Sequence, residues 1–285
     1  MSHRCPNPEC ISPQPKRNGS FFRKSDSKTI QKWKCLACKR SFSTATFERA
    51  YRQNKRRVNA EIGYLLSGGM SMRRIALILN IHRITVARKL AFLAKNALER
   101  HQEFLASIPK VEHVQFDDLI TIEHTKCKPL AISLAVEERS RRILGFQVSR
   151  IPASGKLAKI ARAKYGPRPD QRPGALRKLL SGLKAVLAPG ADFRSDEHPF
   201  YPPVVRALYP DAIHHRHPGG RGSVTGQGEL KKLLFDPLFS LNHTCAMLRA
   251  NINRLFRKTW CTTKKIEGLE RHLAVYMDMH NHRLI

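Results

Sequence analysis

The chain has 285 residues and a formal net charge of +30, from 52 Lys and Arg against 22 Asp and Glu. This length can bury a sizeable core without disulfides, and the excess of positive charge favours a polyanionic partner, with nucleic acid as the first candidate. The apolar runs are too short for a membrane-spanning helix or a signal peptide, so we expect a cytoplasmic protein with no membrane partner.

Two closely spaced cysteine pairs lie near the start of the chain, Cys5 with Cys10 and Cys35 with Cys38. Each pair can offer two thiolates to one tetrahedral ion, and the segment between the pairs has too little apolar content to fold unaided. Residues 1–45 are therefore predicted to form a zinc ribbon around a structural Zn²⁺. Four incidental buried cysteines are the alternative. The predicted aromatic core of the ribbon consists of Phe21, Phe22 and Trp33.

A helix-turn-helix is predicted within residues 46–108. Ser71 suits the N-cap of a helix that ends near Leu79, and a second helix begins near His82 after a tight turn. One face of the second helix would meet base edges in the major groove of DNA, although a plain helical hairpin with a solvated basic face is the alternative. The predicted DNA contacts are Arg83, Thr85, Arg88 and Lys89. The predicted buried stripe consists of Ile84, Ala87, Leu90 and Ala94.

Residues 109–285 have the pattern of an α/β domain with a mixed sheet. Three short apolar strands are expected at 111–121, 129–136 and 142–149, followed by a basic insert at about 150–190 that includes a helix. A fourth strand and further helices follow. A run of histidines and arginines at 214–221 favours a phosphate-contacting loop over a metal cluster, because the histidines lack helical spacing.

Carboxylates stand at the ends of two of these strands. Asp117 and Asp118 end the first strand, and Asp196 follows a later one. Carboxylates at the tips of neighbouring strands can share a divalent ion, and a pair of such ions can clamp the attacking and leaving oxygens of a phosphoryl transfer. The spacing therefore predicts a magnesium site at Asp117 and Asp196.

The order of ribbon, helix-turn-helix and the segments QFDD, SDEHPFYP and LNHTCAMLRANINRLFRKTW resembles bacterial insertion-sequence transposases of the DDE type, closest to the insertion sequence one family and its relatives. The resemblance covers nearly the whole chain. It implies a ribonuclease-H-like catalytic domain over residues 109–285, with Mg²⁺ or Mn²⁺ at Asp117 and Asp196. It further implies cleavage and joining of double-stranded DNA, at terminal inverted repeats and at a target, by a homodimer or a larger assembly.

The third acidic position departs from the family pattern. Asn242 stands where the family glutamate is expected, seven residues before Arg249, and His243 follows it; Glu229 is the alternative third acid. This departure keeps open a catalytically inactive DNA-binding or regulatory protein derived from a transposase, and an enzyme that only cleaves. The basic residues that the resemblance implies for DNA binding are Arg249, Arg254, Arg257 and Lys258.

Overall fold

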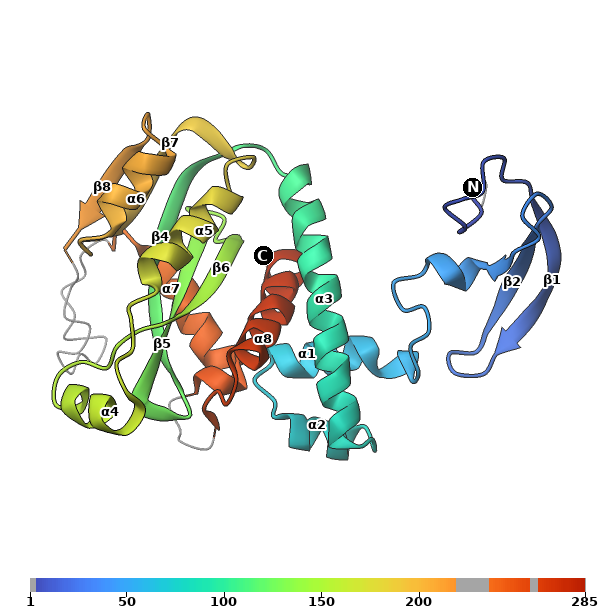
Figure 1. Cartoon of the computed structure of the whole chain (residues 1–285), viewed down its shortest axis with the longest axis horizontal. Coiled ribbons are helices and arrows are strands. Elements are labelled where there is room, and N and C mark those ends of the chain that lie inside the picture. The colour runs from blue at the N-terminus through green and yellow to red at the C-terminus, as the bar shows by residue number, and fades with distance from the viewer. Residues whose placement is uncertain (1–3, 219–235, 257–260, 285) are drawn as a thin grey trace. The chain divides into compact units, whose positions relative to one another are not determined.

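The computed structural model describes residues 4–218, 236–256 and 261–284. By its internal contacts the chain divides into two compact units, Met1–Ile62 and Gly63–Ile285. The division falls within helix α1 (Asn59–Ser67; Figure 1).

The first unit contains a three-stranded antiparallel sheet in the order β1 (Pro15–Arg23), β2 (Lys28–Cys35) and β3 (Ser41–Ser43), followed by two short 3₁₀ helices, Thr44–Phe47 and Arg56–Val58. Its small core consists of Cys5, Cys35 and Phe42, with Trp33 packed against it. The expected aromatic core is wrong for Phe21 and Phe22, which are 40% and 60% exposed. Both lie on the edge strand β1, where no second layer covers the side chains.

The second unit is built on a five-stranded mixed sheet in the order β6-β5-β4-β7-β8. β4, β5 and β6 form an antiparallel meander, whereas β7 and β8 run parallel to β4. The central strand β4 therefore lies between an antiparallel half and a parallel half. The strands are β4 (Val111–Glu123), β5 (Thr125–Glu137), β6 (Ile143–Arg150), β7 (Leu187–Asp196) and β8 (Ile213–His217).

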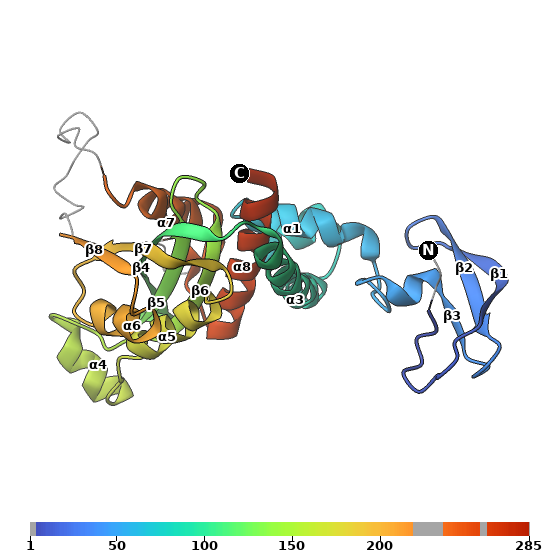
Figure 2. The same cartoon turned by 90° about the horizontal axis from the view of Figure 1, so that it is seen from above.

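Helices cover both faces of this sheet, which explains the continuous buried run along β5 (Figure 2). On one face, Phe116 and Phe193 pack with α5 (Arg172–Gly182) and α6 (Tyr201–Leu208). On the other face, Leu119 and Leu134 pack with α7 (Phe239–Asn251) and α8 (Ile266–Met279). Alternate residues of β4 thus contribute to two separate cores. A short basic helix, α4 (Leu157–Tyr165), precedes α5.

The two helices expected before the sheet are present as α2 (Met72–Ile78), capped by Ser71, and α3 (Arg83–Ser107), capped by His82. α3 continues to Ser107 because residues 97–107 contain no helix breaker and pack against the sheet unit. Arg100 Nε donates to Asp278 Oδ1 of α8 over 2.8 Å. Residues 63–108 belong to the same compact unit as the sheet.

Two further findings concern the helices. The expected buried stripe of α3 is correct for Leu90 and Ala94 but wrong for Ile84, which is 50% exposed because it lies in the first turn, where Val86 is buried instead. Within the described parts of the chain, no helix is both long enough and apolar enough to cross a membrane.

Candidate functional site

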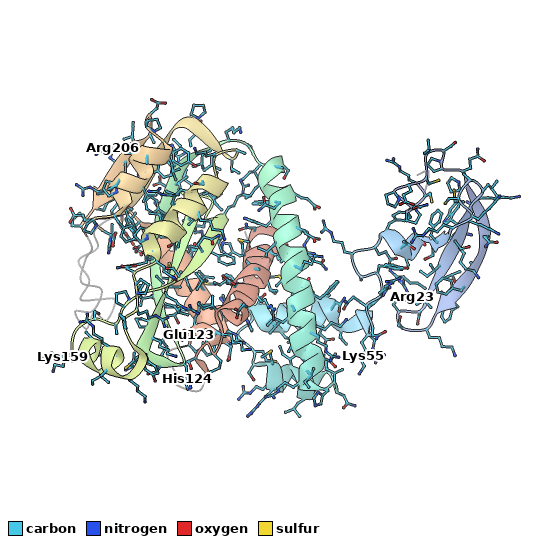
Figure 3. All side chains as sticks on the ribbon, viewed as in Figure 1. Arg23, Lys55, Glu123, His124, Lys159 and Arg206 are labelled. Carbon is cyan, nitrogen blue, oxygen red and sulfur yellow. The ribbon has the colours of Figure 1, made fainter. Side chains whose placement is uncertain are left out.

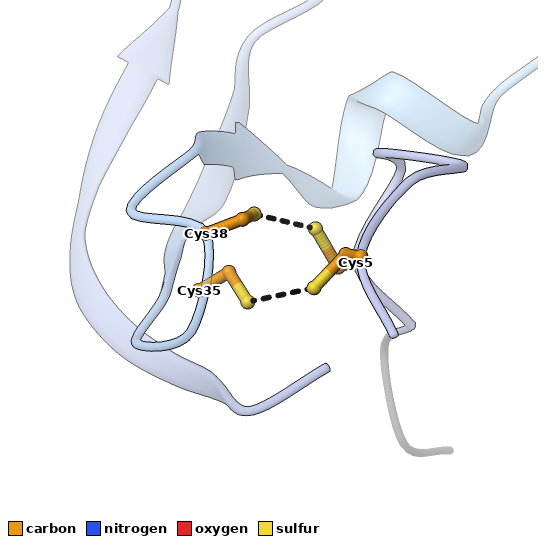
Figure 4. A group of neighbouring side chains, drawn as sticks. Cys5, Cys35 and Cys38 are labelled. Atoms are coloured by element: carbon orange, nitrogen blue, oxygen red, sulfur yellow. Dashed lines mark hydrogen bonds between the residues drawn. The ribbon is translucent and has the colours of Figure 1, made fainter. Parts of the chain in front are cut away.

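The four cysteine thiols of the first unit converge on one point (Figure 4). Sγ of Cys5 lies 3.5 Å from Sγ of Cys38, and Sγ of Cys10 lies 3.7 Å from Sγ of Cys35. All four sulfur atoms lie within 4.8 Å of one another. A tetrahedral zinc ion with Zn–S bonds of about 2.3 Å separates its sulfur ligands by about 3.8 Å. The cluster therefore fits a metal such as zinc.

Two of the four cysteines have lowered pKa values, which favours the thiolate form that binds a cation. Backbone hydrogen bonds, chiefly at Cys38, lower the pKa of the Cys35 thiol to about 6. A backbone hydrogen bond at Arg40 likewise lowers the pKa of Cys38, whereas burial raises the pKa of Cys10 to about 12. Four thiolates crowded together repel one another, and a bound divalent ion removes that repulsion.

Asp117 and Asp196 lie on neighbouring parallel strands. The last paired residues of β4 and β7 are Gln115 and Arg194, and each aspartate stands two residues farther along its strand. Because side chains alternate along a strand, Asp117 and Asp196 face the same side of the sheet, the side covered by α7. The sequence prediction that these two carboxylates neighbour each other agrees with this register.

One oxygen of Asp117, Oδ1, accepts hydrogen bonds from two donors. Tyr201 Oη donates to Asp117 Oδ1 over 3.0 Å, and the backbone N–H of Asp118 donates to the same oxygen over 2.6 Å. Burial, followed by the negative charge of Asp196, raises the pKa of Asp117 to about 6. The two negative charges therefore repel each other.

Asp196 is oriented in a similar way. Its Oδ1 accepts a hydrogen bond from the backbone N–H of His198 over 3.0 Å, which leaves Oδ2 without a hydrogen-bond partner among the described residues. Oδ2 of Asp117 is likewise without one there. Each carboxylate thus has one oxygen fixed by the protein and one available. This donor set suits a hard divalent cation such as Mg²⁺ or Mn²⁺.

Asp118 has a different environment, because it points to the opposite face from Asp117. Its Oδ1 accepts a hydrogen bond from the Ser133 hydroxyl, and its buried Oδ2 has no partner in the described part of the chain. Burial raises the pKa of Asp118. Its position explains why only Asp117 of the adjacent pair lies on the side of Asp196.

α7 is anchored on the sheet beside Asp117. Gln115, two residues before Asp117, accepts from the backbone N–H of Leu241 over 3.0 Å and donates to the Pro237 carbonyl over 3.0 Å. Cys245, one turn farther along α7, is buried, and burial together with the charge of Asp117 raises its pKa to about 12. The sequence gives no local signal for the role of Gln115, whereas the helical spacing of Leu241, Cys245 and Leu248 indicates the buried face of α7.

The residues expected at the third acidic position have their contacts elsewhere. Asn242 is exposed, and its Nδ2 donates to Asp236 Oδ2 over 2.9 Å. His243 lies 3.4 Å from Arg141 Nη1 at the β5–β6 turn. Asn242 and His243 both come before Cys245 along α7. Glu229, the alternative third acid, falls outside the described residues.

The start of α3 presents the expected basic face. Arg83 and Arg88 are exposed and Thr85 is half-buried. Lys89 differs from the expectation: it is only 4% exposed, and its Nζ lies 5.9 Å from the centre of the Phe92 ring. Lys89 is next to Leu90 on the buried side of α3, so its aliphatic stem packs inward.

The basic positions at the end of α7 and after it differ from one another. Arg249 follows Cys245 by one helical turn, and its charge acts to lower the pKa of that thiol. Arg254 is directed into the fold: its Nε donates to His272 Nδ1 over 3.1 Å, and burial lowers its pKa. The side chain of Arg254, which was expected to contact DNA, therefore contacts α8. Arg257 and Lys258 fall outside the described residues.

The basic insert places α4 beside the start of β5. Lys128 Nζ lies 4.5 Å from the centre of the Tyr165 ring, which joins α4 to β5. Lys159, on α4, and His124, at the β4–β5 turn, are labelled in Figure 3. No acidic residue occurs in α4. This surface is suited to phosphate contacts.

Comparison with known protein families and with curated proteins gives no match to this chain.

Proposed function

We propose that the chain is a DNA transposase of the DDE type, which binds the ends of its element and catalyses metal-dependent cleavage and joining of DNA strands. The zinc ribbon and the α2–α3 helix-turn-helix would recognise the terminal inverted repeats. The mixed sheet with helices on both faces is compatible with the ribonuclease-H-like domain that the resemblance implies.

The arrangement of Asp117 and Asp196 carries this proposal. The two carboxylates face one side of the sheet from neighbouring strands, and the charge of Asp196 helps to raise the pKa of Asp117. Such repulsion is unfavourable unless a cation relieves it.

Divalent ions at this site would stabilise charge on the attacking and leaving oxygens of phosphoryl transfer. In the proposed reaction, water attacks a phosphodiester at the element end and releases a 3′ hydroxyl. That hydroxyl then attacks a target phosphodiester, so one P–O bond forms as another breaks in each step. Asp117 and Asp196 would hold the ions, with Tyr201 and the backbone of residues 118 and 198 orienting them.

A non-catalytic DNA-binding or regulatory protein is the second candidate. The contacts of Asn242 with Asp236 and of His243 with Arg141 favour it, since neither side chain supplies a third carboxylate. Both candidates require DNA binding, and a net charge of +30 supports a steep dependence on salt. The assembly of two DNA ends would require at least a dimer.

A strand-transfer assay separates the candidates. Labelled duplexes carrying the DNA that flanks the coding sequence are incubated with the full chain, Mg²⁺ or Mn²⁺, and an unlabelled target. Asp196→Asn is compared with Asp192→Asn, a matched acid on the same strand and face whose carboxylate instead contacts His113. Cleaved and joined products that disappear only in Asp196→Asn support the transposase. Cleavage without joining supports a nuclease, and binding with neither product supports the non-catalytic protein.

A further inference from the structure

A histidine on the edge strand β8 stands next to Asp196. In the parallel pairing of β7 with β8, Asp196 is the partner of His217. Neighbouring strands lie about 4.8 Å apart, and paired residues of parallel strands point to the same side. His217 therefore belongs to the same row of positions across β4, β7 and β8 as Asp117 and Asp196.

The burial pattern identifies the face. His214 packs toward α5 and α6, with its ring 5.6 Å from that of Phe116, and Ser195 on the same face is fully buried. Alternation places His215 and His217 on the opposite face, together with Asp196. This is also the face of Asp117 and α7.

His217 differs from the other two histidines of β8 in its partners. His214 Nε2 lies 2.9 Å from Ser195 Oγ, and His215 Nε2 lies 3.4 Å from Asp192 Oδ1. Nε2 of His217 is buried, and it has no hydrogen-bond partner in the described part of the chain. A buried polar nitrogen without a partner is unfavourable, because it has lost its hydrogen bonds to water and gained none in the protein. A bound ligand would satisfy it.

We propose that His217 is the third ligand of the Asp117–Asp196 site, in the place where a carboxylate was expected. This inference rests on the proposed function. The four cysteines are the only group of three or more potential ligands within 4.8 Å of one another among the described residues, so the side chains of Asp117, Asp196 and His217 must move closer together to bind one ion. An imidazole ligand favours transition metals, whereas Mg²⁺ prefers oxygen ligands. The site should therefore bind Mn²⁺ more tightly than Mg²⁺.

The test is Mn²⁺ binding to the full, zinc-loaded chain, followed by electron paramagnetic resonance, with Mg²⁺ titrations by calorimetry. We expect His217→Ala to weaken Mn²⁺ binding at least about tenfold, since loss of even an outer-shell partner often costs a metal site that much. Mg²⁺ binding should change far less. The pulsed spectrum of bound Mn²⁺ should contain coupling to one imidazole nitrogen, and this coupling should disappear in His217→Ala.

The matched control is His215→Ala, which removes an imidazole from the same strand and face beside Asp192. It should leave both the affinity and the nitrogen coupling unchanged. Thermal unfolding of both variants reports any loss of the fold, and His217→Gln, which retains a polar side chain, provides a second substitution. Nitrogen coupling that persists in a folded His217→Ala or His217→Gln protein would overturn the assignment.

The same experiment separates this inference from the proposed function. If Asp196→Asn abolishes Mn²⁺ binding and His217→Ala does not, the ligand assignment fails and the two-carboxylate site remains. If the nitrogen coupling depends on His217 but no DNA product depends on Asp196, the ligand assignment holds and the transposase proposal fails. If neither variant affects Mn²⁺ binding, both fail.

Discussion

The Tyr201 hydroxyl donates a hydrogen bond to Asp117 Oδ1 over 3.0 Å from a side chain that is only 1% exposed. The contact joins the start of α6 to the centre of β4 across the parallel half of the sheet. It fixes one oxygen of Asp117, Oδ1. Tyr201 is therefore a positioning residue for the proposed metal site.

Removal of this hydroxyl should weaken metal binding. Tyr201→Phe keeps the ring in its core and deletes only the donor, so we expect Mn²⁺ affinity to fall about tenfold, the lower end of the range for outer-shell changes. Tyr209→Phe is the control, because the Tyr209 hydroxyl donates to the Leu180 carbonyl over 2.7 Å. Both variants lose one hydrogen bond. Equal Mn²⁺ affinities in the two variants would rule out the positioning role.

The stability of the metal-free protein should depend on Asp117. Its pKa rises from 3.8 to about 6 on folding, so ionisation of the folded state costs up to about 3 kcal/mol near pH 7. This cost is absent below about pH 4, develops as the pH rises to about 6, and is constant above. Asp117→Asn keeps the oxygen that accepts from Tyr201. We therefore expect it to stabilise the second unit at pH 7, with a gain that shrinks toward pH 4.

Urea unfolding of wild type and Asp117→Asn at several pH values, with chelator present, measures this difference. The matched control is Asp211→Asn, an exposed acid outside the site. A gain for Asp117→Asn that is the same at pH 4.5 and pH 7 would contradict the assigned origin. Asp117→Asn should also lose divalent-metal binding, so its extra stability would accompany loss of function.

Zinc removal should affect the first unit selectively. The core cluster of its sheet consists of Cys5, Cys35 and Phe42, two of which are expected zinc ligands, so loss of the metal should disrupt this cluster. Cys35→Ser should lose bound zinc and expose residues 4–45 to protease, while the second unit stays folded. Cys127→Ser, a half-buried cysteine of β5, is the control. Full protease resistance of zinc-free Cys35→Ser would show that the metal is dispensable.

The exposed start of α3 should bind DNA. Arg88→Ala should weaken binding to the cognate duplex by about 1–3 kcal/mol and relax base preference if it contacts a base edge. Lys95→Ala is the control, since Lys95 lies on the same helix and its side chain is 78% exposed. Binding isotherms at several salt concentrations compare the variants. An equal loss of affinity in the two variants would indicate that α3 contacts DNA through nonspecific charge and is not a recognition helix.

Local patterns in the sequence predict much of this architecture. The apolar strands, the N-caps Ser71 and His82 and the paired cysteines are all encoded within short windows of sequence. Asp117 was expected at the end of its strand, but it lies in the middle of β4, because the strand continues to Glu123. Its common face with Asp196 follows from the register of β4 and β7.

The remaining features depend on long-range packing. Nothing near His217 in the sequence indicates that β8 pairs beside β7, so its place next to Asp196 required the sheet order. Lys89 is buried on α3, and Arg254 contacts His272 of α8; residue type alone indicates neither. Ile84 was misplaced because helical spacing does not show where a buried stripe begins.

Mn²⁺ binding to wild type, Asp117→Asn, Asp196→Asn and the double variant tests the central claim most directly. If the two carboxylates share one site, each single variant removes the same binding event, and the double variant loses nothing further. We predict that one class of Mn²⁺ disappears in either single variant, with strongly non-additive free energies. Additive losses, or single variants that each retain wild-type Mn²⁺ affinity, would contradict a shared metal site at Asp117 and Asp196.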